Sequence, residues 1–447
     1  MPARAAVPSF RNNFAARFAA DLYGLATSLA AAAITARVLG PSGRGYYSSL
    51  VLVSVLFIQL FNGGLGEASV VLPKRDKVDE RRAISATVAA VGPLAVLGAF
   101  ATVAFGALAL TPATSNERLA LALAGLLVLL NTLSTTMSWI LVAKERLVAV
   151  AAVTIVSGTV TTIGIYVLLA VVDLETAGAI LAAIFGCVTT FLPMRHFLQQ
   201  EGVSLRPRWN GPYLRSAARF GMAVQMSNLL VQMTGRLDLL FVFRIAGAAP
   251  AGGYSVALTI GALVGSVPIA IAFASFPRLS NLAEADARAL TPRIFRSGVA
   301  AAGACAAALA VVTPVALPVV FGPAYDAAII PTLVLIPGGV LWSAQWILSR
   351  ASAARGDAKP LFVSFAASFV VMVMLDLLLI KPFALIGAAL ASLTSSLIGL
   401  LVAGAYYRSK GWGWREFVPR GDDVLSMANQ LRQMLRALRG RAPSRGA

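Results

Sequence analysis

Charged and amide side chains recur inside long apolar stretches of this sequence, where a hydrocarbon environment makes them costly. A charge at the centre of a bilayer costs roughly 3 kcal/mol, so such side chains normally face protein or water. Their chemistry suits reversible binding of a polar molecule, and the carboxylates could also carry a coupling proton. The candidates for lining a hydrated cleft are Arg17, Asp21, Asn62, Glu67, Gln225, Asn228, Gln232, Arg236 and Asp238.

Helical spacing indicates which of these groups can work together. Arg17 and Asp21 are four residues apart and can pair on one helix face. The cleft candidates from Gln225 to Arg236 also share one face of a helix. Asp238 points nearly opposite to Arg236, so we expect it to face a neighbouring helix and not to pair with that arginine. The alternative for the small polar residues is that they hold helices together, as they commonly do in membranes.

Sequence motifs for catalysis are absent. The chain has no GxxxxGK[ST] phosphate loop, no HExxH zinc motif, no paired CxxC and no GxSxG nucleophile elbow. Cys187 and Cys305 lie in apolar stretches and are expected in the core, and the single histidine, His196, lies at a helix end. We therefore expect no enzyme activity, no catalytic residue, no cofactor and no metal site.

Composition points to lipid as the main solvent of this chain. Hydrophobic residues make up 58% of the 447 residues and charged residues only 13%, whereas soluble domains average about 25% charged. The apolar residues gather in stretches of about 20, enough to cross about 30 Å of hydrocarbon. The net charge of +18 comes from basic residues scattered between these stretches, so we expect no nucleic-acid partner.

The apolar stretches predict an all-α polytopic membrane protein of about twelve transmembrane helices. The first stretch is too long for the hydrophobic part of a signal peptide and is expected to remain as an anchor. The predicted spans are 16–38, 46–71, 84–110, 118–143, 147–171, 177–198, 219–246, 253–276, 298–321, 328–349, 361–380 and 384–407.

Basic residues identify the predicted cytoplasmic side. One set of alternate loops, which includes both ends of the chain, carries most of the 37 lysines and arginines. The opposite set carries only Arg44, Arg118 and Lys381, while Arg37 and Arg244 lie near the outer interface, where we expect them to snorkel. Because positive loops stay in the cytoplasm, we predict a multi-pass protein of the cell membrane with both termini cytoplasmic.

An internal repeat relates the two halves of the chain. The turn after the first span and the turn after the seventh match at one offset of 207 positions, as from Arg37 to Arg244. Six spans separate the copies, so both halves point the same way and are related by an axis along the membrane normal. This predicts two parallel six-helix lobes around a central cleft. The matched residues are Arg37, Gly40, Gly45, Tyr47 and Ser48 with Arg244, Gly247, Gly252, Tyr254 and Ser255.

These features divide the chain into four predicted segments. They are an N-terminal lobe at 1–200, a cytoplasmic linker at 201–218, a C-terminal lobe at 219–408 and a basic tail at 409–447. From Asp422 the tail places Leu431 and Leu435 on one helical face and Arg432 and Arg436 on another. Such an amphipathic helix would lie on the cytoplasmic leaflet and contact membrane lipid.

Six short segments occur in a characteristic order in spans 1–2 and 7–11. They are Ala36–Tyr46, Arg236–Gly247, Gly253–Ala257, Phe276–Ser280, Phe321–Tyr325 and Ala354–Gly356. Together they resemble the polysaccharide flippases of the multidrug/oligosaccharidyl-lipid/polysaccharide exporter superfamily. The resemblance implies a two-lobed, MATE-like transporter that moves a polyprenyl-diphosphate-linked oligosaccharide to the outer leaflet. It also implies a cationic central cavity, for which Arg17 and Arg236 are the candidates.

The main hypothesis is therefore a flippase of surface polysaccharide biosynthesis, with a polysaccharide polymerase and glycosyltransferases as candidate partners. One alternative is a multidrug or toxin antiporter of the same superfamily. An alternative of another class is a membrane-bound enzyme of polysaccharide assembly. Asp21, Glu67 and Asp238 offset the two cavity arginines, which departs from the family pattern and argues against a strongly anionic glycan.

Overall fold

The computed structural model describes residues 10–75, 78–144, 146–203 and 205–418. No β-strand occurs within these ranges, which confirms the all-α class, while the tail helix predicted from Asp422 lies outside them. The α-helices are α1 (Phe10–Asn62), α2 (Leu65–Arg75), α3 (Glu80–Leu110), α4 (Ser115–Ala143), α5 (Leu147–Tyr166), α6 (Glu175–Gln200), α7 (Gly211–Arg236), α8 (Asp238–Ala246), α9 (Ala248–Asn281), α10 (Glu284–Phe321), α11 (Ile329–Ala354), α12 (Lys359–Ser409) and α13 (Trp414–Phe417).

Two helices are long enough to cross a bilayer twice. α1 has 53 residues and bends at Gly40, whose φ of 65° and ψ of 179° are not helical. α12 has 51 residues and bends at Ala384, whose φ is 46° and ψ is −120°. Pro41 and Pro382 lie beside these bends, and a proline cannot donate the backbone hydrogen bond that a straight helix needs. Each long helix therefore contains two of the predicted spans.

The bend in α12 brings its two ends together beside the α11–α12 connection. The Asp357 carboxylate accepts a hydrogen bond from the hydroxyl of Tyr406 at 2.8 Å and another from the backbone N–H of Lys359 at 3.1 Å. These residues belong to the last and first turns of α12. The hydrogen bond from Tyr406 is the main reason that the pKa of the Asp357 carboxyl is lowered from its ordinary value.

Nine stretches of the described residues are long and apolar enough to cross a membrane, so the chain is a multi-pass membrane protein. Because α1 and α12 supply two predicted spans each, the nine stretches account for eleven of the twelve predicted spans. The remaining predicted span, 219–246, falls on α7 and α8. Its glutamine, asparagine and arginine residues make it more polar than the others, which is the property expected of a helix beside a hydrated space.

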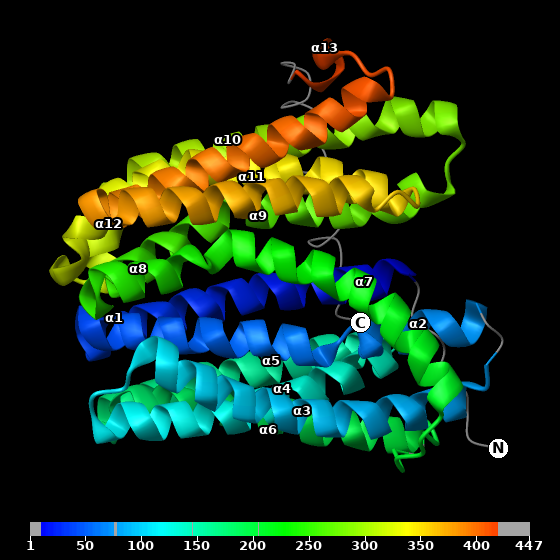
Figure 1. The fold of residues 1–447 in the computed structure, drawn as a ribbon, viewed down its shortest axis with the longest axis horizontal. Helices are drawn as coiled ribbons and strands as arrows, with labels where there is room; N and C mark the ends of the chain where they lie inside the picture. The colour runs from blue at the N-terminus through cyan, green and yellow to red at the C-terminus, as the bar shows by residue number, and fades with distance from the viewer. Residues whose placement is uncertain (1–9, 76–77, 145, 204, 419–447) are drawn as a thin grey trace, which may run out of the picture. The chain divides into compact units, whose positions relative to one another are not determined.

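Contacts divide the chain into two compact units, and the first contains Met1–Val256, Leu317–Ala328 and Ile380–Leu385. Within it, α3, α4, α5 and α6 pack lengthwise with α1 (Figure 1). Leu50, Leu121 and Ile180 are almost fully buried where α1, α4 and α6 meet. By these contacts α7, α8 and the start of α9 also belong to the first unit, whereas the lobe boundaries expected at 200 and 219 stay a prediction.

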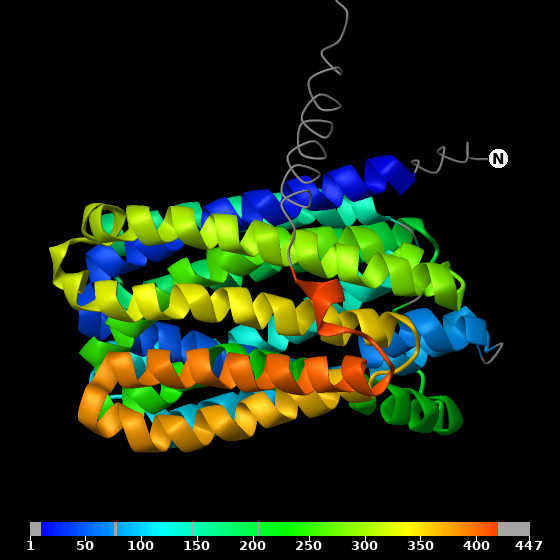
Figure 2. The same ribbon diagram turned by 90° about the horizontal axis from the view of Figure 1, so that it is seen from above.

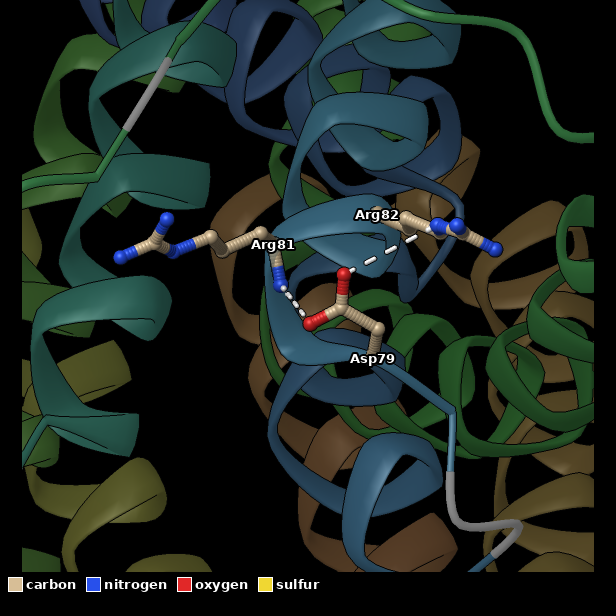
Figure 3. Close-up of polar contacts among 3 residues, drawn as sticks. All are labelled: Asp79, Arg81 and Arg82. Atoms are coloured by element: carbon tan, nitrogen blue, oxygen red, sulfur yellow. Dashed lines mark hydrogen bonds and ion pairs between the residues drawn. The ribbon is translucent and has the colours of Figure 1, made fainter.

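Polar residues at the loops determine where the helices of the first unit begin. Asp79 accepts a hydrogen bond from the backbone N–H of Arg81 at 3.3 Å and forms an ion pair with Arg82 at 3.9 Å (Figure 3). A carboxylate at this position satisfies a free N–H and is favoured by the helix dipole. Past the other end of α3, Thr114 and Glu117 form a reciprocal capping box at the start of α4.

The second unit contains Ala257–Ala316, Ile329–Leu379 and Ile386–Ala447. Figure 2 shows its α10, α11 and α12 running lengthwise. Val264, Ala302 and Ile336 form a core cluster of α9, α10 and α11. α11 and α12 also share a polar contact, because Gln345 donates to the hydroxyl of Ser368 at 3.1 Å. A buried amide in such a core is tolerated when it is hydrogen-bonded.

Candidate functional site

The two turns of the internal repeat have the same backbone geometry. Gly40 has φ of 65° and ψ of 179°, and its equivalent Gly247 has φ of 101° and ψ of 177°. Both residues lie in the left-handed range of φ, which a residue with a Cβ rarely adopts. The shared conformation agrees with the equivalence that the offset of 207 positions predicts.

The two turns also contact each other reciprocally. A side chain at Gly45 would overlap the carbonyl oxygen of Ala248, and a side chain at Gly252 would overlap the carbonyl oxygen of Pro41. The same offset relates Gly45 to Gly252 and Pro41 to Ala248. The contact of Gly45 with Ala248 is therefore equivalent to the contact of Gly252 with Pro41. This reciprocity is typical of a contact with twofold symmetry. The backbones approach this closely because both crossing residues are glycine.

Arg37 and Arg244 form a second reciprocal pair beside these turns. Arg37 donates through Nε to the carbonyl of Val320 at 2.9 Å and through Nη2 to that of Val319, in the last turn of α10. Arg244 donates through Nη1 to the carbonyl of Ala109 at 3.3 Å, in the last turn of α3. A cation at a helix C-terminus satisfies free carbonyls and opposes the helix dipole. The two arginines, which are exposed, thus cap helices of the opposite repeat, and their position at the outer interface stays a prediction.

Arg44, which the sequence analysis assigns to an exposed loop, is instead buried within α1. Its side chain is 7% exposed and donates to the hydroxyl of Ser255 at 3.2 Å and to that of Thr35. The guanidinium also lies 5.7 Å from the ring centroid of Tyr47. The loop assignment was wrong because α1 resumes directly after its bend and turns this residue inward. Hydrogen bonds make such a buried cation tolerable.

Asp238 lies at the start of α8 and is fully buried. Its carboxylate accepts hydrogen bonds from the hydroxyl of Tyr254 in α9 and from the backbone N–H of Leu239 at 2.8 Å. Arg236 is within electrostatic range of this carboxylate and also of Arg44. The first unit therefore holds a polar cluster of α1, α8 and α9 close to the reciprocal turns.

The chain breaks between α1 and α2 at two glycines. Gly63 and Gly64 have φ of 61° and 66°, and a side chain at Gly64 would overlap the backbone of Gly221 in α7. On either side of the break, one side-chain oxygen of Asn62 and one of Glu67 have no hydrogen-bond partner among the described residues. Buried polar atoms are nearly always paired in native proteins. Each of these two oxygens therefore has an unused capacity to accept a hydrogen bond.

The polar face of α7 begins in a helix contact and opens toward its C-terminal end. Gln225 is 1% exposed and donates to the backbone carbonyl and, at 3.3 Å, to the side-chain oxygen of Gln59 in α1. Asn228 and Gln232 are half-buried, and Arg236 is exposed. Gln225 thus ties α7 to α1, while Arg236, at the end of this face, has an exposed side chain whose guanidinium lies within electrostatic range of Asp238.

Two of the predicted site residues cannot be placed in this way. Arg17 and Asp21 belong to α1, but their side chains lie outside the part of the structure that is described. Within the described part, no group of three or more His, Cys, Asp or Glu side chains is arranged to hold a metal ion.

Sequence reasoning missed two buried polar residues, Arg44 and Gln345. The repeat gives no signal for Arg44, because the equivalent residue, Ala251, is apolar. A polar contact of Gln345 could have been predicted, because an amide inside an apolar span normally has a polar partner. Its partner, Ser368, is 23 residues away in another helix and is not identifiable from local spacing.

A family model described as "Polysaccharide biosynthesis protein" matches residues 34–331 of the chain. No curated protein sequence matches it. Among solved structures, the chain is similar to the lipid II flippase MurJ in an inward closed conformation, with a TM-score of 0.72 and 12% identity over 96% of this chain and 93% of that one.

Two further solved structures have the same fold. One is an inward-facing multidrug resistance MATE family transporter of the MOP superfamily, with a TM-score of 0.67 and 12% identity over 86% of this chain and 95% of that one. The other is a MOP superfamily transporter from Pyrococcus furiosus, with a TM-score of 0.63 and 14% identity over 90% of this chain and 97% of that one. The chain therefore has the fold of these membrane transporters.

Proposed function

The chain belongs to the polysaccharide biosynthesis protein family, and we propose that it is a flippase for a lipid-linked oligosaccharide. In this proposal the substrate is a polyprenyl-diphosphate-linked oligosaccharide, which crosses from the cytoplasmic to the outer leaflet of the cell membrane. The protein makes and breaks no covalent bond. Family membership supports the pathway, and the fold shared with transporters supports translocation as the mode of action.

The observation that carries the proposal is the polar face of α7. Asn228, Gln232 and Arg236 are spaced at four-residue intervals and become more accessible toward the arginine. A guanidinium binds phosphate oxygens through two parallel hydrogen bonds, and amides suit sugar hydroxyls. Arg17 is the proposed second ligand of the diphosphate. The glycan would cross along this face while the lipid tail stays in the bilayer.

The reciprocal turns suit an outer closure that opens during transport. They join through glycine backbones at Gly45 and Gly252 and through the hydrogen bonds of Arg37 and Arg244. Backbone carbonyls released from such contacts can be solvated by water once the turns separate, which keeps the cost of opening low. Movement of a substrate to the outer leaflet requires such a separation.

Glu67 is the proposed site for a coupling proton. It is half-buried in a span, and one of its oxygens has no hydrogen-bond partner among the described residues. Asp238, in contrast, already accepts two hydrogen bonds and is fully buried. A carboxylate with one oxygen outside any hydrogen bond can gain and lose a proton there with little rearrangement.

The proposal is tested by replacing both arginines in the variant Arg17→Ala, Arg236→Ala. Loss of two charge-assisted phosphate contacts should lower translocation of a fluorescent lipid-linked oligosaccharide in vesicles by about tenfold or more. Surface polysaccharide should be lost in cells that carry only this variant. Arg118→Ala is the matched control, because Arg118 is an exposed arginine at the start of α4, away from the proposed face.

Normal translocation by the double variant, at normal protein levels, would contradict the assigned substrate face. A folded and inactive double variant together with an active Arg118→Ala protein is the expected pair of results. Polysaccharide polymerase and glycosyltransferases are the proposed functional partners, and their genes should be needed for the same surface polymer.

A multidrug antiporter is the second candidate, favoured by the likeness to a multidrug resistance MATE family transporter. It predicts that cells without the protein become drug-sensitive while their surface glycan is unchanged. A membrane-bound assembly enzyme is distinguished by turnover of lipid-linked sugar by the purified protein in detergent, where no gradient or second leaflet exists. The flippase proposal expects neither result.

A further inference from the structure

The chain folds back after α12 and covers an apolar cavity in the second unit. This half-open cavity has a volume of about 300 Å³, and its walls are almost entirely apolar. Leu348 and Leu401 come from α11 and α12, Phe295 from α10, and Trp414 and Phe417 from α13. The turn into α13 can be followed at the end of α12 in Figure 2.

Aromatic rings hold this cover in place. Phe417 contacts Phe295 edge-on at 5.4 Å between ring centroids, and Tyr407 contacts Trp412 at 5.4 Å. A Cβ on Gly404 would lie 2.7 Å from the ring of Trp414, so this indole packs directly on α12. Tyrosine and tryptophan are enriched where a membrane protein meets the interface between hydrocarbon and water. The aromatic lining of the cavity is the kind expected at such an interface.

Two arginines of α10 fasten the folded-back segment. Arg288 donates to the backbone carbonyl of Lys410 at 2.7 Å, and Arg296 donates to that of Glu416 at 2.7 Å. Both hydrogen bonds are accepted by backbone carbonyls of the segment after α12. They therefore stabilise its backbone conformation whatever its side chains are. The cavity is thus formed by the protein itself and is available in advance of a ligand.

Basic residues outnumber acids in the two segments that border the cavity, and the Asp357 carboxylate also lies within electrostatic range of Lys410. Residues 286–296 and 408–418 contain the six cations Arg288, Arg293, Arg296, Arg408, Lys410 and Arg415, and only two acids, Asp286 and Glu416. Glu416 is already engaged by the backbone N–H of Gly413 at 2.8 Å. Arg408 lines the cavity, and both it and Arg415 are exposed. An apolar chamber beside two exposed cations matches a molecule with a hydrocarbon chain and an anionic head.

We propose that this cavity binds one acyl chain of an anionic phospholipid, with the lipid phosphate held by Arg408 and Arg415. Leu400 and Arg408 both line the cavity and are eight residues apart on α12, so the cavity extends about 12 Å from the charged end into the apolar part of the span. A sugar would find no polar wall there, and a zwitterionic lipid would leave the excess positive charge unmatched. The lipid would secure the end of α12 to one leaflet.

The proposal is tested by photocrosslinking to the full-length protein in phosphatidylcholine vesicles. The probe is a phosphatidylglycerol with a photoreactive group near the end of one acyl chain. We expect labelling of the peptides that contain Leu400–Gly404 and Trp412–Val418, roughly fivefold or more above that by a phosphatidylcholine probe with the same chain. Equal labelling by both probes, or labelling only of other segments, would overturn the proposal.

Two variants separate the role of charge from that of the cavity. Arg408→Gln, Arg415→Gln should lower phosphatidylglycerol labelling roughly fivefold or more, whereas Arg81→Gln, Arg82→Gln removes two equally exposed cations at α3 and should not (Figure 3). Gly404→Val fills the space beside Trp414 and should abolish labelling, while Gly303→Val, at a position with nothing within 4 Å, should not. Undiminished labelling of both cavity variants would contradict the assignment.

The competing occupant is the chain itself, because residues 419–447 follow directly after the cavity. After replacement of Cys187 and Cys305, a disulfide formed efficiently between Leu401→Cys and Leu431→Cys or Leu435→Cys would show that the tail fills the cavity and would overturn lipid binding. Absence of this disulfide together with phosphatidylglycerol labelling is the expected result. Neither measurement depends on translocation of an oligosaccharide, so the lipid site and the flippase function can fail separately.

Discussion

Charged side chains in the first unit are stabilised by hydroxyl groups as well as by opposite charges. Arg44 is bound by Thr35 and Ser255, and Asp238 is bound by Tyr254. Tyr254 and Ser255 are neighbours in α9, so one hydroxyl binds an anion and the adjacent hydroxyl binds a cation. A change at either charge removes hydrogen bonds from buried hydroxyl groups, which costs stability in an interior that water does not reach.

Asp238→Ala should lower the free energy of unfolding by about 1–3 kcal/mol, because the Tyr254 hydroxyl and the Leu239 N–H both lose their acceptor. Asp238→Asn keeps one carbonyl oxygen and should cost less. Thermal unfolding of the purified proteins in one detergent measures both. Asp326→Ala is the control at an exposed carboxylate, and an equal loss for Asp326 and Asp238 would contradict the importance of this cluster.

The role of a residue was predictable where it follows from the pattern within one span. It was not predictable where it depends on a contact between two helices. The face of α7 is identifiable from spacing within one helix, and Gly40 and Gly247 from the repeat. The burial of Arg44 and the pairing of Gln345 with Ser368 depend on which helices become neighbours. Local periodicity contains no information on that choice.

At the scale of helices, the reciprocal turns show why glycine is needed at two equivalent positions. Gly45 and Gly252 have no unusual φ, so their requirement comes from contact and not from backbone conformation. In both cases the atom that a side chain would meet is a backbone carbonyl, which cannot move aside as a side chain can. The overlap caused by a side chain could therefore be removed only by a shift of a whole helix.

Gly45→Ala and Gly252→Ala should each lower the midpoint of thermal unfolding, since either methyl group separates the same two turns. Gly92→Ala is the matched control, because Gly92 lies in α3 with nothing within 4 Å, and it should be neutral or stabilising by roughly 0.5–1 kcal/mol. The double variant should cost less than the sum of the single ones, because the first substitution has already moved the helices apart. Full additivity would indicate two independent contacts.

Most helix ends followed from composition, but two helix breaks did not. The bend at Gly40 falls between predicted spans and that at Ala384 at the first residue of the span 384–407, and a proline lies beside each. The break between α7 and α8 at Leu237 falls inside the predicted span 219–246. The break at Gly63–Gly64 falls inside the predicted span 46–71. A pair of glycines in a membrane helix is also compatible with close packing, so only the position of α7 decides that the chain breaks there.

At the scale of the molecule, the alternation of basic loops predicts which segments share a side of the membrane. After Cys187 and Cys305 are replaced, single cysteines at Ser42 and Ala113 should react with an impermeant maleimide in intact cells. Cysteines at Arg82 and Ser409 should react only after the membrane is opened. All four positions are exposed or half-buried in the structure, so burial does not limit labelling.

A cysteine at Ser409 that reacts in intact cells while one at Arg82 does not would place the end of α12 and the start of α3 on opposite faces of the membrane. That result would remove the common orientation on which the proposed substrate path depends. The number of spans and the fold were predictable because hydrophobicity, charge and the repeat agree. The arrangement of α7 and α8 within the first unit and the cover formed by α13 were not, because both depend on contacts between distant parts of the chain.

The contact between the two turns at Gly45 and Gly252 also bears on the origin of the protein. Its two sides are equivalent, so an ancestral polypeptide of half the length could have made the same contact between two separate copies as a symmetric dimer. Gene fusion would then have preserved a dimer interface inside one chain. A side chain at either glycine would push apart the turns of both halves, so we expect the two positions to be constrained together.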